Sequence, residues 1–92
     1  MTRRTTKTQL TGRETKRLWL TYPKKLIQRP VIYELGHRFD VVTNIRQASI
    51  TEEVGILSLE VTGTPDEIQK AIRWLQRLGI KVEPVAVQLK ES

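Results

Sequence analysis

The 92-residue sequence contains no cysteine, only one histidine and few aromatic residues. Without thiolates the chain can form no disulfide, no cysteine-ligated zinc site and no iron–sulfur cluster. No apolar run approaches the roughly 20 residues that a membrane-spanning helix needs, and the N-terminus has no apolar stretch typical of a signal peptide. We therefore expect a cytoplasmic protein without a metal or other cofactor and without membrane insertion.

Recognisable catalytic patterns are missing as well. No motif places a histidine or lysine beside Ser49, Ser58 or Ser92, and the sequence has no glycine-rich phosphate loop. His37 is predicted to lie on the face of a helix opposite its apolar residues, where it would point to water. We therefore expect that no residue is catalytic and that the protein is not an enzyme but acts by binding.

The net charge of +6 is concentrated at the start of the chain. Residues 1–30 hold nine basic side chains and one acidic side chain, whereas residues 31–92 hold seven basic and nine acidic ones. Residues 1–14 are rich in threonine and show no periodicity, so they are predicted to form a flexible basic arm before a folded domain at 15–92. The arm and the start of the first strand supply these basic residues: Arg3, Arg4, Lys7, Arg13, Lys16 and Arg17.

The first half of the folded part alternates between strand and helix patterns. Leu18, Leu20 and Tyr22 recur with a period of two, which predicts a strand that ends at Pro23. A short helix is predicted over about 30–39, with Pro30 in its first turn. A β-branched run from 41 to about 50 predicts a second strand, and residues 51–53 form a polar turn into a third strand that ends near Gly63.

The clearest helix signal lies in the second half. Thr64, Pro65 and Glu67 provide a capping hydroxyl, a first-turn proline and an acidic residue three positions after the cap. Gly79 suits a left-handed C-terminal cap, so this helix is predicted over about 65–78. A fourth strand follows over about 81–89, and Pro84 indicates that its start lies at a sheet edge or in a bulge.

The order βαββαβ predicts an α+β fold of the ferredoxin-like type, a four-stranded antiparallel sheet with both helices on one face. The other face of the sheet then has no helix to cover it. Strand alternation places Trp19, Thr21, Ile56 and Ser58 on this open face. Because exposed apolar side chains on a sheet are usually covered by a partner, we predict a homodimer or another protein interface there.

Several segments in the right order and spacing resemble the NIL domain, a small relative of the ACT-type regulatory domains. The matching segments are Leu-Trp-Leu-Thr-Tyr-Pro at 18–23, Arg-Pro-Val-Ile-Tyr-Glu-Leu at 29–35, Phe-Asp-Val at 39–41, Asn-Ile at 44–45, Gly-Ile-Leu at 55–57, Val-Thr-Gly at 61–63, Ile-Arg-Trp-Leu at 72–75 and Gly-Ile-Lys-Val at 79–82. The resemblance covers about three quarters of the chain. It departs from the family's Asn-Ile-Leu motif at Arg46, which replaces leucine.

The resemblance implies a βαββαβ fold, dimerisation through the sheet and, in methionine importer ATPases, a methionine site near the second strand. It implies that Asn44, Ile45 and Arg46 form a ligand site. Asparagine beside a guanidinium suits an amino-acid or carboxylate ligand, although each residue could also be an ordinary strand residue. Since the chain carries no ATPase sequence, it is expected to be a standalone regulatory or adaptor domain.

Two further partners remain open at this stage. The basic arm could dock on an acidic protein partner, or it could bind phosphate backbones without sequence specificity. Some ferredoxin-like sheets bind RNA through paired aromatic residues, but the third strand here lacks them and carries Glu60. A nucleic-acid-binding module is therefore the alternative hypothesis, after the regulatory or adaptor domain.

Overall fold

Strands and helices follow the predicted order through residues 12–85, the part of the chain that the computed structural model describes. A short 3-10 turn is added after the first strand. The elements are β1 (Glu14–Pro23), η2 (Lys24–Leu26), α2 (Val31–Arg38), β2 (Val41–Ile50), β3 (Val54–Gly63), α3 (Pro65–Leu78) and β4 (Lys81–Pro84).

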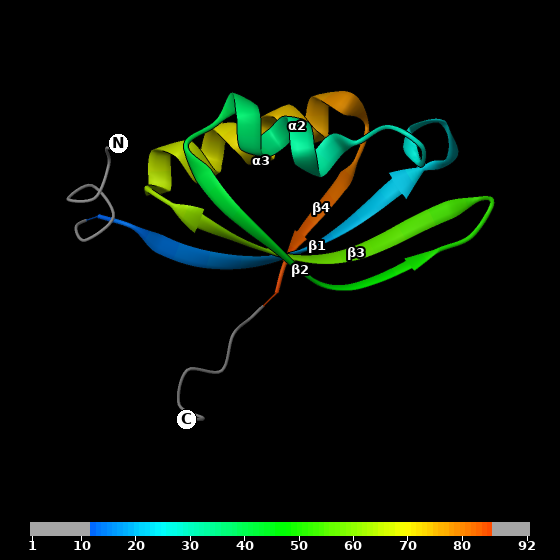
Figure 1. Cartoon of the computed structure of the whole chain (residues 1–92), viewed down its shortest axis with the longest axis horizontal. Helices are drawn as coiled ribbons and strands as arrows, with labels where there is room; N and C mark the ends of the chain where they lie inside the picture. Colours follow the sequence, from blue (N-terminus) through cyan, green and yellow to red (C-terminus); the bar gives the residue numbers. More distant parts are fainter. Residues whose placement is uncertain (1–11, 86–92) are drawn as a thin grey trace.

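The four strands form one antiparallel sheet with the order β2-β3-β1-β4. Both helices lie against the same face of this sheet, so its other face carries no helix (Figure 1). The predicted ferredoxin-like α+β fold is thereby confirmed. As Pro84 indicated, β4 is an edge strand.

The core lies between the sheet and the helices. The inward residues of β1 and β3 alternate with outward ones, and the residues that point inward are almost completely buried: Leu18, Leu20, Tyr22, Leu57, Leu59 and Val61. From the helices, Val31 and Leu35 of α2 meet Ile68, Ala71 and Leu75 of α3 in the same cluster. Among them, Leu18, Leu20 and Tyr22 are the residues that the two-residue period of the first strand placed on one face.

Helix α3 begins and ends where its capping residues predict. The hydroxyl of Thr64 accepts a hydrogen bond from the backbone N–H of Glu67 at 3.2 Å, and Gly79 ends the helix with a φ of 101°. The Glu67 carboxylate does not turn back to its own cap. It accepts the backbone N–H of Asp40 at 2.9 Å, so the start of α3 is tied to the start of β2.

The other connections are short. Pro30 is the residue immediately before α2, and the helix starts at Val31, one residue later than predicted. Between β2 and β3, Thr51 closes the turn, because its backbone N–H donates to the carbonyl of Val54 at 2.9 Å and its hydroxyl accepts the N–H of Val54 at 3.1 Å.

Two sequence predictions lie partly outside the described residues. The predicted flexible arm covers residues 1–14, of which the structure describes only 12–14, and Glu14 already belongs to β1. The predicted fourth strand runs to 89, whereas the described part of it ends at Pro84. Among residues 12–85, no helix is long and apolar enough to cross a membrane.

Candidate functional site

The open face of the sheet presents one row of side chains after another across the strands. Arg17 of β1 lies opposite Glu60 of β3, which in turn pairs with Asn44 of β2. The next row contains Trp19, Ser58 and Gln47. The row of Thr21, Ile56 and Ser49 follows toward the β2–β3 turn.

Glu60 is the centre of the charged row. The Nη2 of Arg17 donates to its Oε2 at 2.8 Å, and Nη1 of Arg46 lies 3.6 Å from the same oxygen. Two guanidinium groups from the strands on either side of β3 therefore meet one carboxylate. The sequence suggests that Arg46 pairs with a ligand carboxylate, whereas the structure places a carboxylate of the chain itself beside it.

A β-bulge brings Arg46 to this position. The pairing of β2 with β3 runs from Ile45 opposite Leu59 directly to Gln47 opposite Ser58, so Arg46 is the extra residue. A bulge changes the alternation of the strand and re-aims the side chains that follow it. Simple alternation from Asn44 would put Gln47 on the helix side, but the bulge puts it on the open face in the row of Trp19.

The pKa of the Glu60 carboxyl is held below its ordinary value by this neighbourhood. The first cause is the hydrogen bond from Arg17, and the charge of Arg46 and the side chain of Asn44 act in the same direction, partly offset by desolvation. The carboxylate is therefore ionised at neutral pH. Asn44, Arg46 and Glu60 form one electrostatic unit with Arg17.

Arg17 also carries an unsatisfied donor. Its Nε is buried and has no hydrogen-bond partner among residues 12–85. A buried polar group left without a partner costs about 1–3 kcal/mol, so such groups are rare and a bound ligand, water or ion is one way to supply the missing acceptor. Arg17 is thus a site residue as well as a basic residue of the N-terminal third, and no sequence pattern indicated the unsatisfied Nε.

Beside the charged row lies a shallow hollow of about 360 Å³. It is lined by residues of β1, β2 and β3 and by Val85, which follows β4. These residues are Arg17, Trp19, Arg46, Gln47, Ser58 and Val85. Val85 reaches it because its backbone N–H donates to the carbonyl of Arg17 at 2.8 Å, which extends the pairing beyond β4. Gln47 and Val85 were not singled out from the sequence.

Ile45 does not join this group. It pairs with Leu59, whose side chain belongs to the core between sheet and helices, so Ile45 lies on the helix side of β2 with 52% of its surface exposed. The motif residues Asn44, Ile45 and Arg46 are consecutive, but only Asn44 and Arg46 reach the open face. A ligand in the hollow on the open face would not contact the Ile45 side chain.

The four predicted interface residues differ in how much of their surface is exposed to solvent. Trp19 and Ile56 are 36% and 40% exposed and give the open face two large apolar side chains, with Thr21 half-buried beside them. Ser58 is only 3% exposed, because Trp19 and Gln47 flank it in its row. It belongs to the floor of the hollow rather than to a contact surface.

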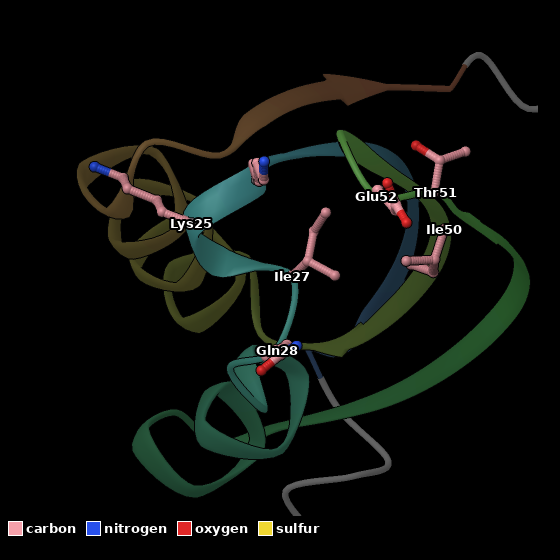
Figure 2. A pocket seen from close by; sticks show the side chains of 7 residues that line it. Lys25, Ile27, Gln28, Ile50, Thr51 and Glu52 are labelled. Atoms are coloured by element: carbon pink, nitrogen blue, oxygen red, sulfur yellow. The ribbon is translucent and has the colours of Figure 1, made fainter.

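A larger hollow, about 710 Å³, lies at the end of the molecule where η2 approaches the β2–β3 turn. Figure 2 shows Ile27 and Ile50 on opposite sides of it, with the Lys25 side chain directed away. Lys24 makes an exposed ion pair with Glu53 at 3.7 Å, and no charged side chain is buried here. The hollow on the open face is smaller but holds the convergent charges and the unsatisfied donor, so we take it as the candidate site.

The basic residues predicted to form an arm are divided by the structure. Arg3, Arg4 and Lys7 lie outside the described residues. Arg13 precedes β1, Lys16 lies on β1 with Nζ 4.0 Å from the carboxylate of Glu14, and Arg17 points into the open face.

Within residues 12–85 no group of three or more histidine or acidic side chains could hold a metal ion.

The asparagine of the second strand, the bulge beside it and the open face lie within the segment that the known proteins match. A family model described as the NIL domain matches residues 16–84, three quarters of the sequence. This chain belongs to the NIL domain family. The resemblance seen in the sequence is thereby confirmed.

Similar proteins include two methionine import ATP-binding proteins named MetN. The protein from Symbiobacterium thermophilum is 39% identical over 61 residues, covering 62% of this chain and 18% of its own length. The protein from Escherichia coli K12 is 34% identical over 70 residues, covering 72% of this chain and 20% of its own length. The NIL chain therefore spans about a fifth of the length of these relatives.

A solved structure supports the fold. The C-terminal domain of an ABC transporter ATP-binding protein from Enterococcus faecalis superimposes with a TM-score of 0.69, covering 79% of this chain and 86% of that one. At 22% identity this likeness shows a common fold and nothing further. Membership of the family rests on the NIL domain match.

Proposed function

We propose that this NIL domain is a non-enzymatic regulatory domain that binds a small amino-acid-like ligand in the hollow on its open sheet face. The observation that carries the proposal is the convergence of Arg17, Asn44 and Arg46 on Glu60 beside that hollow. Charged hydrogen-bonding groups of both signs in one shallow site suit a ligand that itself carries both signs.

The relatives support a regulatory role. Their names describe importers of methionine that bind ATP, and the NIL chain matches about a fifth of each. A domain of this size that accompanies an ATP-binding subunit is suited to sensing, because a ligand that prefers one arrangement of the domain shifts the state of the larger protein. By this reasoning the chain senses a metabolite and acts on a larger protein partner.

Pairing of two copies is part of the proposal. Trp19 and Ile56 give the open face an apolar area that no helix of residues 12–85 covers, and a second copy placed on it by a twofold axis would bury both side chains. The ligand hollow lies on the same face. Ligand binding and pairing would therefore be linked, so that the ligand changes the dimer's stability.

Calorimetry tests the ligand site directly. The native chain is titrated with methionine and with other amino acids, and the titrations are repeated with Asn44→Ala and Arg46→Leu. Each variant removes a hydrogen bond to a charged ligand group, which is worth about 1.5–3 kcal/mol, so the affinity is expected to fall about ten- to a hundredfold.

The matched control is Arg73→Leu, because Arg73 is exposed on α3, on the far side of the sheet. It should bind the same amino acids with unchanged affinity. Absence of binding to the native chain at millimolar concentration would contradict the ligand site. An equal loss in the Arg73 variant would show that the effect of Arg46→Leu is not local.

The nucleic-acid alternative has less support from the open face. Trp19 is the one aromatic residue that the described strands present there, and Glu60 places a negative charge at its centre. Base stacking on a sheet needs aromatic platforms, and phosphates avoid carboxylates. This alternative depends on Arg3, Arg4 and Lys7, and a steep loss of RNA binding with rising salt would be its signature.

A further inference from the structure

The hollow on the open face contains an uneven set of charges. Arg17 and Arg46 line it with two guanidinium groups, and one carboxylate, that of Glu60 beside the lining residues, contacts both of them. Both guanidinium groups reach the same oxygen of Glu60, at 2.8 and 3.6 Å, so the three charged groups lie within one small area. Another charged pair on this face lies on β4, where Nζ of Lys81 is 3.8 Å from the carboxylate of Glu83.

A ligand that matches this set has two negative groups and one positive group. We infer that the hollow selects an acidic α-amino acid, with its two carboxylates toward Arg17 and Arg46 and its ammonium group toward Glu60. This inference rests on the proposed function and names the ligand class of that site. A neutral amino acid would leave one guanidinium group without a counter-charge, and a dicarboxylate would leave Glu60 facing a second anion.

The state of Arg17 favours the same class. Glu60 takes its Nη2, but the buried Nε has no acceptor among residues 12–85. The guanidinium group therefore has donor capacity that the described residues do not use. A planar guanidinium pairs best with a carboxylate, which accepts two parallel N–H groups at once.

The walls of the hollow suit a short polar ligand better than a long apolar one. Gln47 and Ser58 line it with an amide and a hydroxyl, and Trp19 and Val85 line it with apolar groups. Ile45, the apolar residue before Arg46, lies on the helix side of the sheet, whereas the charged Arg46 lines the hollow. An apolar side chain of methionine length would therefore meet charged and polar groups along much of the hollow.

Glu60 is the residue that should make the hollow bind an amino acid more tightly than a dicarboxylate without an ammonium group. Its carboxylate is ionised at neutral pH and contacts both arginines that line the hollow. An ammonium group on the ligand would gain a charged hydrogen bond there. A ligand without it would gain only repulsion from Glu60.

Competition among four small probes tests the inference on the full chain. The probes are L-glutamate, L-glutamine, which lacks the second carboxylate, glutarate, which lacks the ammonium group, and L-methionine. Calorimetry should give L-glutamate an affinity at least tenfold higher than each of the other three. Trp19 fluorescence provides a second readout, since Trp19 lines the hollow.

Two variants assign the contacts. Glu60→Gln should reduce the preference for L-glutamate over glutarate by tenfold or more, because the ammonium group loses its counter-charge. Arg46→Gln should reduce the preference for L-glutamate over L-glutamine by a similar factor. Glu53→Gln in the β2–β3 turn, an exposed carboxylate away from the hollow, should leave both preferences unchanged. Melting curves check folding, and if Glu60→Gln fails to fold, the exposed Arg46→Gln still tests the second carboxylate.

The outcomes separate this inference from the proposed function. If methionine or glutamine binds more tightly than L-glutamate, the inference is overturned while the amino-acid site stands. If none of the four probes binds at millimolar concentration, both are overturned. If L-glutamate is preferred but Glu60→Gln and Arg46→Gln leave the preferences intact, the ligand lies elsewhere and the assignment to this hollow is wrong.

Discussion

Tyr22 lies at the end of β1 with its ring in the core, and burial raises the pKa of its hydroxyl to about 12 from an ordinary value of 10.0. The unfolded chain loses this proton about two pH units earlier than the folded chain does. Folding stability should therefore be fully present below pH 10 and should fall as the pH rises from 10 to 12. The loss is on the order of 2–3 kcal/mol, since one pKa unit corresponds to about 1.4 kcal/mol.

Urea denaturation between pH 9 and pH 12 measures this loss. Lysine side chains titrate in the same range, so the comparison that matters is with Tyr22→Phe, which keeps the ring and removes the proton. The difference in unfolding free energy between the two proteins should change by about 2–3 kcal/mol as the pH rises from 10 to 12. A difference that stays constant across the range would show that the hydroxyl is not shielded from water.

At the residue scale, the sequence predicted burial well and the site only in part. Alternation placed Leu18, Leu20 and Tyr22 on one face and Trp19 on the other, and burial follows this two-residue period. It could not show that Ser58, on the open face, would be almost completely buried. It also gave no sign that Arg17 would share Glu60 with Arg46, since that contact joins residues from three strands.

At the element scale, elements with their own boundary signals were predicted best. The capping residues Thr64 and Gly79 fixed α3, whose observed bounds are Pro65–Leu78, because each satisfies backbone groups locally. The bulge in β2 had no such signal. Its sequence around Arg46 contains no glycine, and the extra residue becomes visible only when β2 is aligned with its partner β3.

The bulge leads to a prediction about chain length. Arg46 has no partner in the pairing of β2 with β3, so deletion of Arg46 should leave Ile45 opposite Leu59 and Gln47 opposite Ser58. The chain should stay folded, although a residue is removed from the middle of a ten-residue strand, and it should lose amino-acid binding.

Nuclear Overhauser contacts between β2 and β3 decide the outcome. Persistence of the contact between Gln47 and Ser58 supports the bulge. A slip that places Gln47 opposite Leu59 would contradict it, because a slip of one residue moves every later side chain of the strand to the opposite face. Deletion of Thr43, a paired residue opposite Val61, is the matched control and should disrupt the strand.

At the scale of the whole molecule, the open face is the feature that most needs a partner. Both helices occupy one side of the sheet (Figure 1), and the strand register places Trp19 and Ile56 on the other. The sequence predicted this asymmetry from the order of the elements. It could not show the hollow, which depends on the bulge and on Val85 joining β1 after Pro84.

A dimer through this face should appear in sedimentation velocity at micromolar concentration. Trp19→Lys and Ile56→Lys place charges at the centre of the contact and should each shift the chain to the monomer, without loss of the folded state by circular dichroism. Tyr33→Lys is the control, because Tyr33 is a large exposed aromatic residue on α2, on the helix side. A native chain that sediments as a monomer, or a dimer that Tyr33→Lys disrupts equally, would contradict pairing through the sheet.

The most direct test of the central claim is the location of ligand binding, measured by amide chemical shifts of the labelled full chain during titration with a mixture of amino acids. The account predicts saturable shifts centred on Arg17, Asn44, Arg46 and Glu60, with none at the larger hollow around Ile27 and Ile50. Shifts confined to the larger hollow, or no shifts at millimolar amino acid, would contradict it.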